Sequence, residues 1–405
     1  MRAVLVLVAV SGCGAAVPAL PGKGGPAWTE LQSEHFTMWT DASVARGREL
    51  IREMEHLHQV VFGVAFPALP TAGKSFVLAL RDRYEVNAYV PEQFEAFSWP
   101  GGNPLRQPVI VFPADVDEKN DHVIAHELTH VISHVIIHDQ PPWFAEGIAE
   151  FFETVTLDAD RAVVDVGEPR KQQVSEVRHL SLVPGDALFG CKKLDCRDER
   201  FYMTAGLLFA YLANAHPTEL VRFEELLAKG DEHAWATTFP QLTAGTLDAQ
   251  LRAWALQGSH RVWHFTTKLE QPKLVERTLA DGDVLSVRAL LAYSFHAGEP
   301  NPAEATALAA DPTNVITNLI AYDRTHAIDV ATARGIAAAH PDDWRSWFLL
   351  AIALPTGDEA EAAHAKACTL AATNPANNVG GFCSAHALDE KTGTSEHGRQ
   401  PALPQ

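Results

Sequence analysis

Basic residues are scarce in this chain, with 32 Lys and Arg against 51 Asp and Glu and a formal net charge of −19 over 405 residues. A field of this sign repels a phosphate backbone, so we expect no nucleic-acid partner. Hydrophobic residues make up 47% of the chain and charged residues 20%, which excludes a disordered or collagen-like protein. The length suggests two to three domains, each able to bury its own core.

Apolar runs long enough to cross a membrane are also missing. The run at residues 3–10 has eight residues, whereas a spanning helix needs about 20. Arg2, this run and the small residues before Cys13 form the pattern of a signal peptide over residues 1–12. The segment VSGC resembles the lipobox of bacterial lipoproteins, so we expect Cys13 to be lipidated and residues 13–27 to form a tether. An ordinary signal peptide that contains Cys13 is the alternative.

Cysteine is rare, with five residues and no CxxC spacing. Apart from Cys13, the chain has Cys191, Cys196, Cys368 and Cys383. An exported protein can keep disulfides, and four cysteines allow three pairings. The economical pairing joins Cys191 to Cys196 and Cys368 to Cys383, because each bond then closes a short loop.

The hydrophobic pattern changes along the chain from mixed to helical. Residues 28–66 alternate at first and then become helical, and residues 75–80 and 108–112 predict buried strands. Further on, the pattern predicts helices at residues 122–138, 143–153, 201–215, 220–229 and 247–257, with a short hairpin or excursion at 158–166.

Beyond about residue 270 the chain becomes rich in alanine. Pro312, Pro341 and Pro375 are each followed by a segment of helical character. Residues 331–339 and 347–353, on either side of Pro341, resemble a tetratricopeptide helix pair. An irregular helical bundle is the alternative.

The residues with clear chemical potential form an HExxH motif, His126-Glu127-Leu128-Thr129-His130. On a helix, positions i and i+4 lie on one face, so both imidazoles can reach one Zn²⁺. Glu127 is then placed to take a proton from the metal-bound water rather than to bind the metal. Two histidines with ordinary packing roles are the alternative.

A catalytic zinc site usually has three protein ligands. Glu146, sixteen residues after His130, lies on the next predicted helix, which has room to return antiparallel. Glu150 lies one turn beyond Glu146 and is placed to accept a hydrogen bond from a ligand histidine; it is also the reserve candidate for the third ligand. His134 and His138 lie further along the first helix, and we expect them to pack or to serve a second site.

HELTH followed by PPWFAEGIAEFFE resembles the gluzincin metallopeptidases, and most closely the peptidase-MA-like domains of bacterial exported proteins. The specific likeness covers residues 121–153, and a weaker one extends over residues 28–257. The resemblance implies that His126, His130 and Glu146 bind zinc and that Glu127 is the general base. The metzincin pattern fails, because residues 133 and 136 are Ser and Ile rather than Gly and His.

Two further features bear on peptide hydrolysis. Tyr202 opens a later helix, where aminopeptidase-type gluzincins place a tyrosine that stabilises the oxyanion; a core tyrosine is the alternative. The strand at residues 109–112 is either the sheet edge on which an extended substrate pairs or a buried core strand. No GxMEN-like segment is present, so the sequence does not support an aminopeptidase.

These observations predict an α+β fold with a small N-terminal sheet and a mainly helical zincin-like catalytic domain. We expect that domain to cover residues 28–265, with an α+β part at 28–117 and a helical part at 118–265. An all-α, tetratricopeptide-like region is expected at residues 266–385, and a disordered tail at 386–405.

The expected function is that of a zinc-dependent peptidase that hydrolyses peptide bonds by attack of a metal-bound water. A lipid would anchor it to the periplasmic face of a bacterial membrane, and its C-terminal helices could bind a protein partner. The alternative is a non-catalytic helical-repeat lipoprotein that binds proteins and keeps a metallopeptidase-like scaffold. A purely structural zinc is disfavoured, because such sites are usually rich in cysteine.

Overall fold

The computed structural model describes residues 17–66, 73–89, 96–116, 122–158, 163–168, 182–192, 196–258, 260–266, 271–295 and 301–383. Cys13, the predicted signal peptide and the predicted tail at residues 386–405 lie outside these residues. The described chain mixes helices and strands, as an α+β fold requires, and helices predominate. Among the described residues, no helix is both long and apolar enough to span a membrane.

The main sheet has six described strands in the order β4-β5-β3-β2-β1-β9. In chain order they are β1 (Thr29–Gln32), β2 (Phe36–Thr40), β3 (Ser75–Leu80), β4 (Phe97–Trp99), β5 (Val109–Pro113) and β9 (Val275–Thr278). The central strands β2, β3 and β5 are parallel, while β4, β1 and β9 pair antiparallel with their neighbours. The strands predicted at residues 75–80 and 108–112 are confirmed as β3 and β5.

Helices cover both faces of this sheet. Side chains alternate between the two faces along a strand, and in β3 the residues Val77 and Ala79 join one hydrophobic cluster while Phe76, Leu78 and Leu80 join another. The first cluster includes α1 (Val44–Ala65) and α3 (His122–Ile136). All six residues of β3 are therefore buried.

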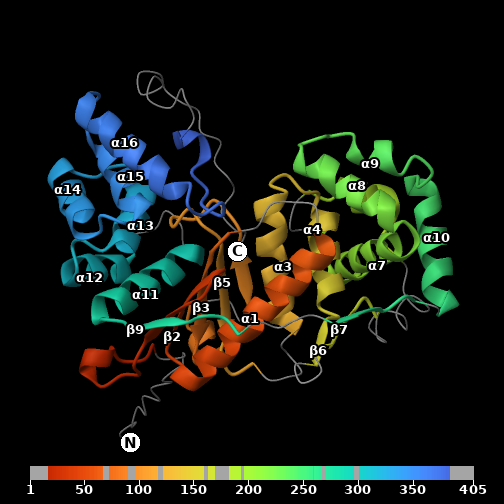
Figure 1. Cartoon of the computed structure of the whole chain (residues 1–405), viewed down its shortest axis with the longest axis horizontal. Helices are drawn as coiled ribbons and strands as arrows, with labels where there is room; N and C mark the ends of the chain where they lie inside the picture. The colour runs from red at the N-terminus through yellow and green to blue at the C-terminus, as the bar shows by residue number, and fades with distance from the viewer. Residues whose placement is uncertain are drawn as a thin grey trace, which may run out of the picture.

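The second cluster belongs to the C-terminal helices, which lie to one side of the sheet in Figure 1, coloured teal to blue. They are α11 (Asp281–Phe295), α12 (Pro302–Ala310), α13 (Val315–Thr325), α14 (Val330–Ala339), α15 (Trp344–Ala353) and α16 (Asp358–Ala371). Leu290, Leu319 and Phe348 of these helices share that cluster with Trp39 and Leu78 of the sheet. The helices predicted at residues 331–339 and 347–353 are α14 and α15, which pack together.

A second group of helices, mostly green in Figure 1, lies on the opposite side of the molecule. It contains α4 (Pro142–Phe152), α6 (Gly185–Gly190), α7 (Glu199–Ala215), α8 (Pro217–Ala228), α9 (Ala234–Thr238) and α10 (Ala244–Gln257). The predicted hairpin is observed as β6 (Thr156–Asp158) and β7 (Val163–Val166), which β8 (Trp263–Thr266) extends to three strands. A short helix, α2 (Arg83–Asn87), follows β3.

The interpretation of residues 109–112 as a sheet edge was wrong. These residues belong to β5, which pairs with β3 on one side and β4 on the other. Among the described strands, the three-residue strand β4 lies at this end of the sheet instead. β4 was not predicted from the sequence, because three residues are too few for a period-2 pattern.

Two disulfides are present in the described residues. They join Cys191 to Cys196 and Cys368 to Cys383, as the sequence predicts. The first lies directly before α7, and the second joins α16 to a short 3-10 helix, η3 (Gly380–Cys383). A further 3-10 turn, η1 (Pro21–Lys23), precedes β1.

Candidate metal centre

The two histidines of the HExxH motif face the same way from α3. The apolar side of this helix, including Ile124, Leu128 and Ile132, is buried in the core and fixes the helix rotation. His126 and His130 therefore project one turn apart. Their Nε2 atoms lie 3.0 Å from each other.

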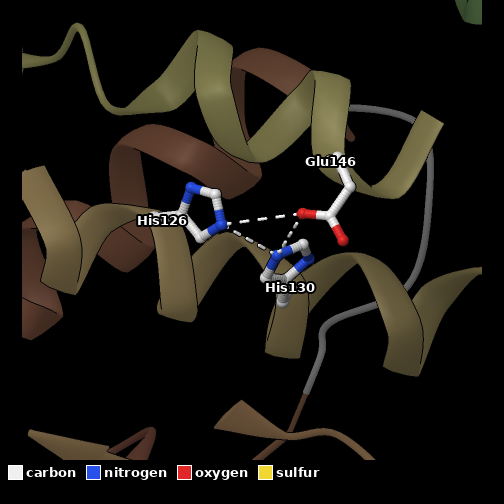
Figure 2. Close-up of side chains that lie close together, drawn as sticks. All are labelled: His126, His130 and Glu146. Carbon is white, nitrogen blue, oxygen red and sulfur yellow. Dashed lines mark hydrogen bonds and ion pairs between the residues drawn. The ribbon is translucent and has the colours of Figure 1, made fainter. Parts of the chain in front are cut away.

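Glu146 completes the group from α4. Pro142 occupies the first turn of this helix, where its fixed φ favours a helix start. The Glu146 side chain points towards the two imidazoles in Figure 2, with Oε2 3.1 Å from His130 Nε2 and 3.7 Å from His126 Nε2. These three residues form a group that can hold a metal ion.

The spacing of the donor atoms suits a small tetrahedral cation. Bonds of about 2.0–2.1 Å place two ligands of a tetrahedron ~3.3 Å apart. The observed separations of 3.0, 3.1 and 3.7 Å lie on both sides of that value. Two imidazole nitrogens and one carboxylate oxygen therefore fit such an ion with little rearrangement.

Glu153 contacts and orients His126, although we did not expect this role for Glu153 from the sequence. Its Oε1 atom lies 2.5 Å from His126 Nδ1, so the ring presents Nε2 to the metal position. We predicted this kind of role for Glu150, which lies beside both residues: ligand atoms of His126, Glu150 and Glu153 are within 4.8 Å of one another. Glu153 follows Glu146 by seven residues, which places it two helical turns further along on the same face. This spacing could have predicted from the sequence that Glu153 lies in the site.

Charge–charge contacts shift the ionisation of the group. Burial lowers the pKa of His126, but the hydrogen bond to Glu153 and the charges of nearby carboxylates outweigh burial and raise it to about 9. Burial raises the pKa of Glu146, yet the charge and hydrogen bond of His130, with His126 and Arg197, lower it to about 2. A metal ion that binds here would have to displace a proton from His126, so we expect metal affinity to fall as the pH falls.

Arg197 also contacts the group, and nothing in its sequence spacing indicated this. Its Nη1 atom donates to Glu146 Oε1 over 2.9 Å. The two oxygens of this carboxylate thus have different partners, Arg197 for Oε1 and the imidazoles for Oε2. Glu146 itself is 6% exposed.

Tyr202 lies in the first turn of α7, close enough for the charges of this group to shift its pKa. Burial raises its pKa to about 12, and the charges of Glu146, Glu127 and Glu150 add to burial while Arg197 opposes it. The phenol is therefore protonated at neutral pH and can donate a hydrogen bond. The charges that act on Tyr202 place it near the group formed by His126, His130 and Glu146.

His134 and His138 form a separate pair. Their rings meet edge to face with centroids 5.8 Å apart. Burial and the charge of His138 lower the pKa of His134. Within the described ranges, neither residue belongs to a group that can hold a metal.

Comparison with known proteins gives no match, either to a protein-family model or to a curated protein. Function is therefore inferred from the chemistry of the site.

Proposed function

We propose that this protein is a zinc-dependent peptidase whose metal ligands are His126, His130 and Glu146. The convergence of these three donors beside Glu127 is the observation that carries the proposal. Two histidines and one glutamate are a known ligand set of catalytic zinc, in which a fourth position stays open. The absence of cysteine from the group disfavours a structural zinc.

In this proposal, zinc would act as a Lewis acid that polarises the scissile carbonyl and acidifies water. Glu127 follows His126 directly in the helix and would accept the proton of the attacking water. It would then return this proton to the leaving amine, so that one carboxylate serves both half-steps. Tyr202, protonated at neutral pH, would donate a hydrogen bond to the developing oxyanion.

We propose β4 as the place where an extended peptide binds. Among the described strands it is one of the two at the ends of the sheet, and it packs against α3, the helix that carries both histidines. A terminal strand can add a further strand through backbone hydrogen bonds. A peptide paired with β4 would lie beside α3, which suits a peptide or protein substrate.

The finer subdivision of the fold is part of the proposal. We interpret the sheet, α1, α3, α4 and α7 as a zincin-like catalytic unit, and α14 and α15 as a tetratricopeptide-like pair. The exposed surfaces of stacked helix pairs commonly bind proteins, so the C-terminal helices are the proposed region for a protein partner. We also retain the proposal of an exported lipoprotein anchored through Cys13.

Metal content and peptide cleavage test the function. We expect about one zinc per chain by elemental analysis, loss of zinc in His126→Ala, and cleavage of a peptide library by the wild-type protein. Glu127→Gln should keep the metal and lose at least about 100-fold in turnover, because general-base catalysis contributes ~10²–10⁴-fold. Glu219→Gln, at an exposed position on α8, is the control.

Full turnover in Glu127→Gln on a responsive substrate would refute the mechanism. A wild-type protein that binds zinc but cleaves no peptide, or binds no metal, would favour the non-catalytic, protein-binding alternative.

A further inference from the structure

The two carboxylate oxygens of Glu146 have different partners. Oε2 faces His130 Nε2 at 3.1 Å, while Oε1 accepts a hydrogen bond from Arg197 Nη1 at 2.9 Å. Hydrogen bonds between charged groups are about twice as strong as neutral ones. The Glu146 side chain is 7% exposed and that of Arg197 20% exposed, so water competes little for this contact.

The chain around Arg197 is fixed on both sides. Cys196, the preceding residue, is bonded to Cys191. Asp198, the following residue, is the N-cap of α7 and accepts a hydrogen bond from Phe201 N over 3.0 Å. Ordering the long side chain of Arg197 costs rotamer entropy. Because the backbone on both sides is already fixed, ordering this residue costs little additional backbone entropy.

We propose that Arg197 is a positioning residue that makes Glu146 a single-oxygen metal ligand, and that the Cys191–Cys196 disulfide holds Arg197 in place. The inference rests on the proposed metal centre. With Oε1 held by Arg197, only Oε2 is available to the ion. The fourth position then stays open for water instead of being filled by the second oxygen of the same carboxylate.

Neutralisation of a buried carboxylate is the simpler role for Arg197. Charge neutralisation and positioning of Glu146 can be distinguished by replacing Arg197 with lysine. A lysine restores the positive charge, but its flexible stem and point charge do not reproduce the planar geometry of guanidinium. Neutralisation alone predicts that Arg197→Lys binds metal like wild type, whereas positioning predicts only partial recovery.

The first experiment measures zinc affinity by competition with a chelator. We expect Arg197→Gln to weaken zinc binding about 10–100-fold, the usual effect of removing a group that orients a metal ligand, and Arg197→Lys to fall between the two. Arg334→Gln, which breaks an exposed pair with Glu359, is the control and should bind like wild type. Equal affinities for wild type, Arg197→Gln and Arg197→Lys would overturn the proposal.

Cobalt substitution tests denticity directly. Four-coordinate Co²⁺ absorbs visible light more strongly than five-coordinate Co²⁺. We expect strong bands for the wild-type protein and weaker bands for Arg197→Gln, in which both Glu146 oxygens can reach the ion. Identical spectra would leave Arg197 with a charge role alone and would overturn the positioning role.

The disulfide is tested with a matched pair of variants. We expect Cys191→Ser/Cys196→Ser to weaken zinc binding in the same direction as Arg197→Gln, and Cys368→Ser/Cys383→Ser to leave it unchanged, with circular dichroism verifying the fold of both. Equal affinities in the two double variants would refute the role of the first disulfide. Zinc binding that depends on Arg197, without any peptide cleavage, would support this inference while the proposed peptidase activity fails.

Discussion

At the scale of single residues, α3 contributes two imidazoles, and carboxylates of α3 and α4 surround them. These carboxylates differ in role. The i, i+4 spacing of His126 and His130 follows from helix geometry, so the sequence was sufficient to pair them. Glu146 could be inferred as the third donor, because the helix that carries it has room to return antiparallel to the helix of the two histidines. The separate partners of its two oxygens depend on Arg197, whose position relative to α4 results from tertiary packing.

We predict that Glu153→Gln weakens zinc binding about 10–100-fold, because His126 loses the partner that fixes its ring. Chelator competition measures this. Glu150→Gln is the matched variant on the same helix and should have the smaller effect. A larger loss of zinc affinity in Glu150→Gln than in Glu153→Gln would mean that Glu150 orients His126, as the sequence alone suggested.

Glu224 is a second residue with an unusual environment. It is 3% exposed, it lines a cavity of about 180 Å³ with Phe209 and Trp263, and burial raises its pKa well above the usual value. A raised folded-state pKa means that the folded protein holds this proton more tightly than the unfolded chain does. Stability from this group is therefore complete at low pH and is lost as the pH rises towards the folded-state pKa.

We predict that Glu224→Gln is about 1–3 kcal/mol more stable than wild type at pH 8, with a smaller difference at pH 5. Urea unfolding at both pH values provides the measurement. Glu225→Gln, at the neighbouring half-buried position, is the control for the loss of a carboxylate from α8. A difference that is the same at both pH values would contradict this account of Glu224.

At the scale of elements, the contact between α4 and α7 decides where Glu146 lies. Gly147 faces α7, and a Cβ atom at this position would lie 2.6 Å from the carbonyl oxygen of Ala205 and 3.2 Å from Phe209 Cβ. The lack of a side chain therefore permits the close approach of the two helices. Because Glu146 is the adjacent residue, a shift of α4 would also move this proposed metal ligand.

We predict that Gly147→Ala destabilises the protein by about 1–3 kcal/mol, the usual range for an overpacked core, and weakens zinc binding. Thermal unfolding and chelator competition measure the two effects. Gly245→Ala in α10 is the control, since nothing lies within 4 Å of its added Cβ. Wild-type stability in Gly147→Ala would mean that α4 and α7 can separate freely.

Most elements were predictable because their hydrophobic periods are long enough to read. The predicted helix at residues 122–138 corresponds to α3, and the strand at 75–80 to β3. The exceptions are short or distant in sequence: β4 has three residues, and β9 joins the sheet from far along the chain. All four residues of β9 are exposed, so it carries no buried pattern to detect.

At the scale of the whole molecule, one sheet supports two helical layers. The C-terminal helices share a buried cluster with Trp28, Trp39 and Phe76, residues from the first part of the chain. Arg277 on β9 adds a polar link, since its Nη2 atom lies 2.8 Å from Glu30 Oε2 on β1. The region after residue 266 therefore completes the core of the sheet.

We predict that a fragment ending at residue 268 does not fold cooperatively. Without β9 and α11–α16, the face of the sheet that carries Trp39, Phe76 and Leu78 would be exposed as a large apolar patch. Size-exclusion chromatography and thermal circular dichroism are the measurements, with a chain ending at residue 385 as the control for truncation. A monomeric fragment with a cooperative transition and zinc binding would instead define an independent domain.

The sequence by itself determined what depends on near neighbours: the pairing of His126 with His130, the regular elements with a clear period, and the loops closed by the two disulfides. These features arise from helix repeat, side-chain alternation and short chain separations, all of which are local. Only the tertiary structure decided that β4 rather than β5 lies at one end of the described sheet, that Arg197 holds one oxygen of Glu146, and that the C-terminal helices complete the sheet core. Such contacts join segments far apart in the chain, and their positions follow from how the whole core packs.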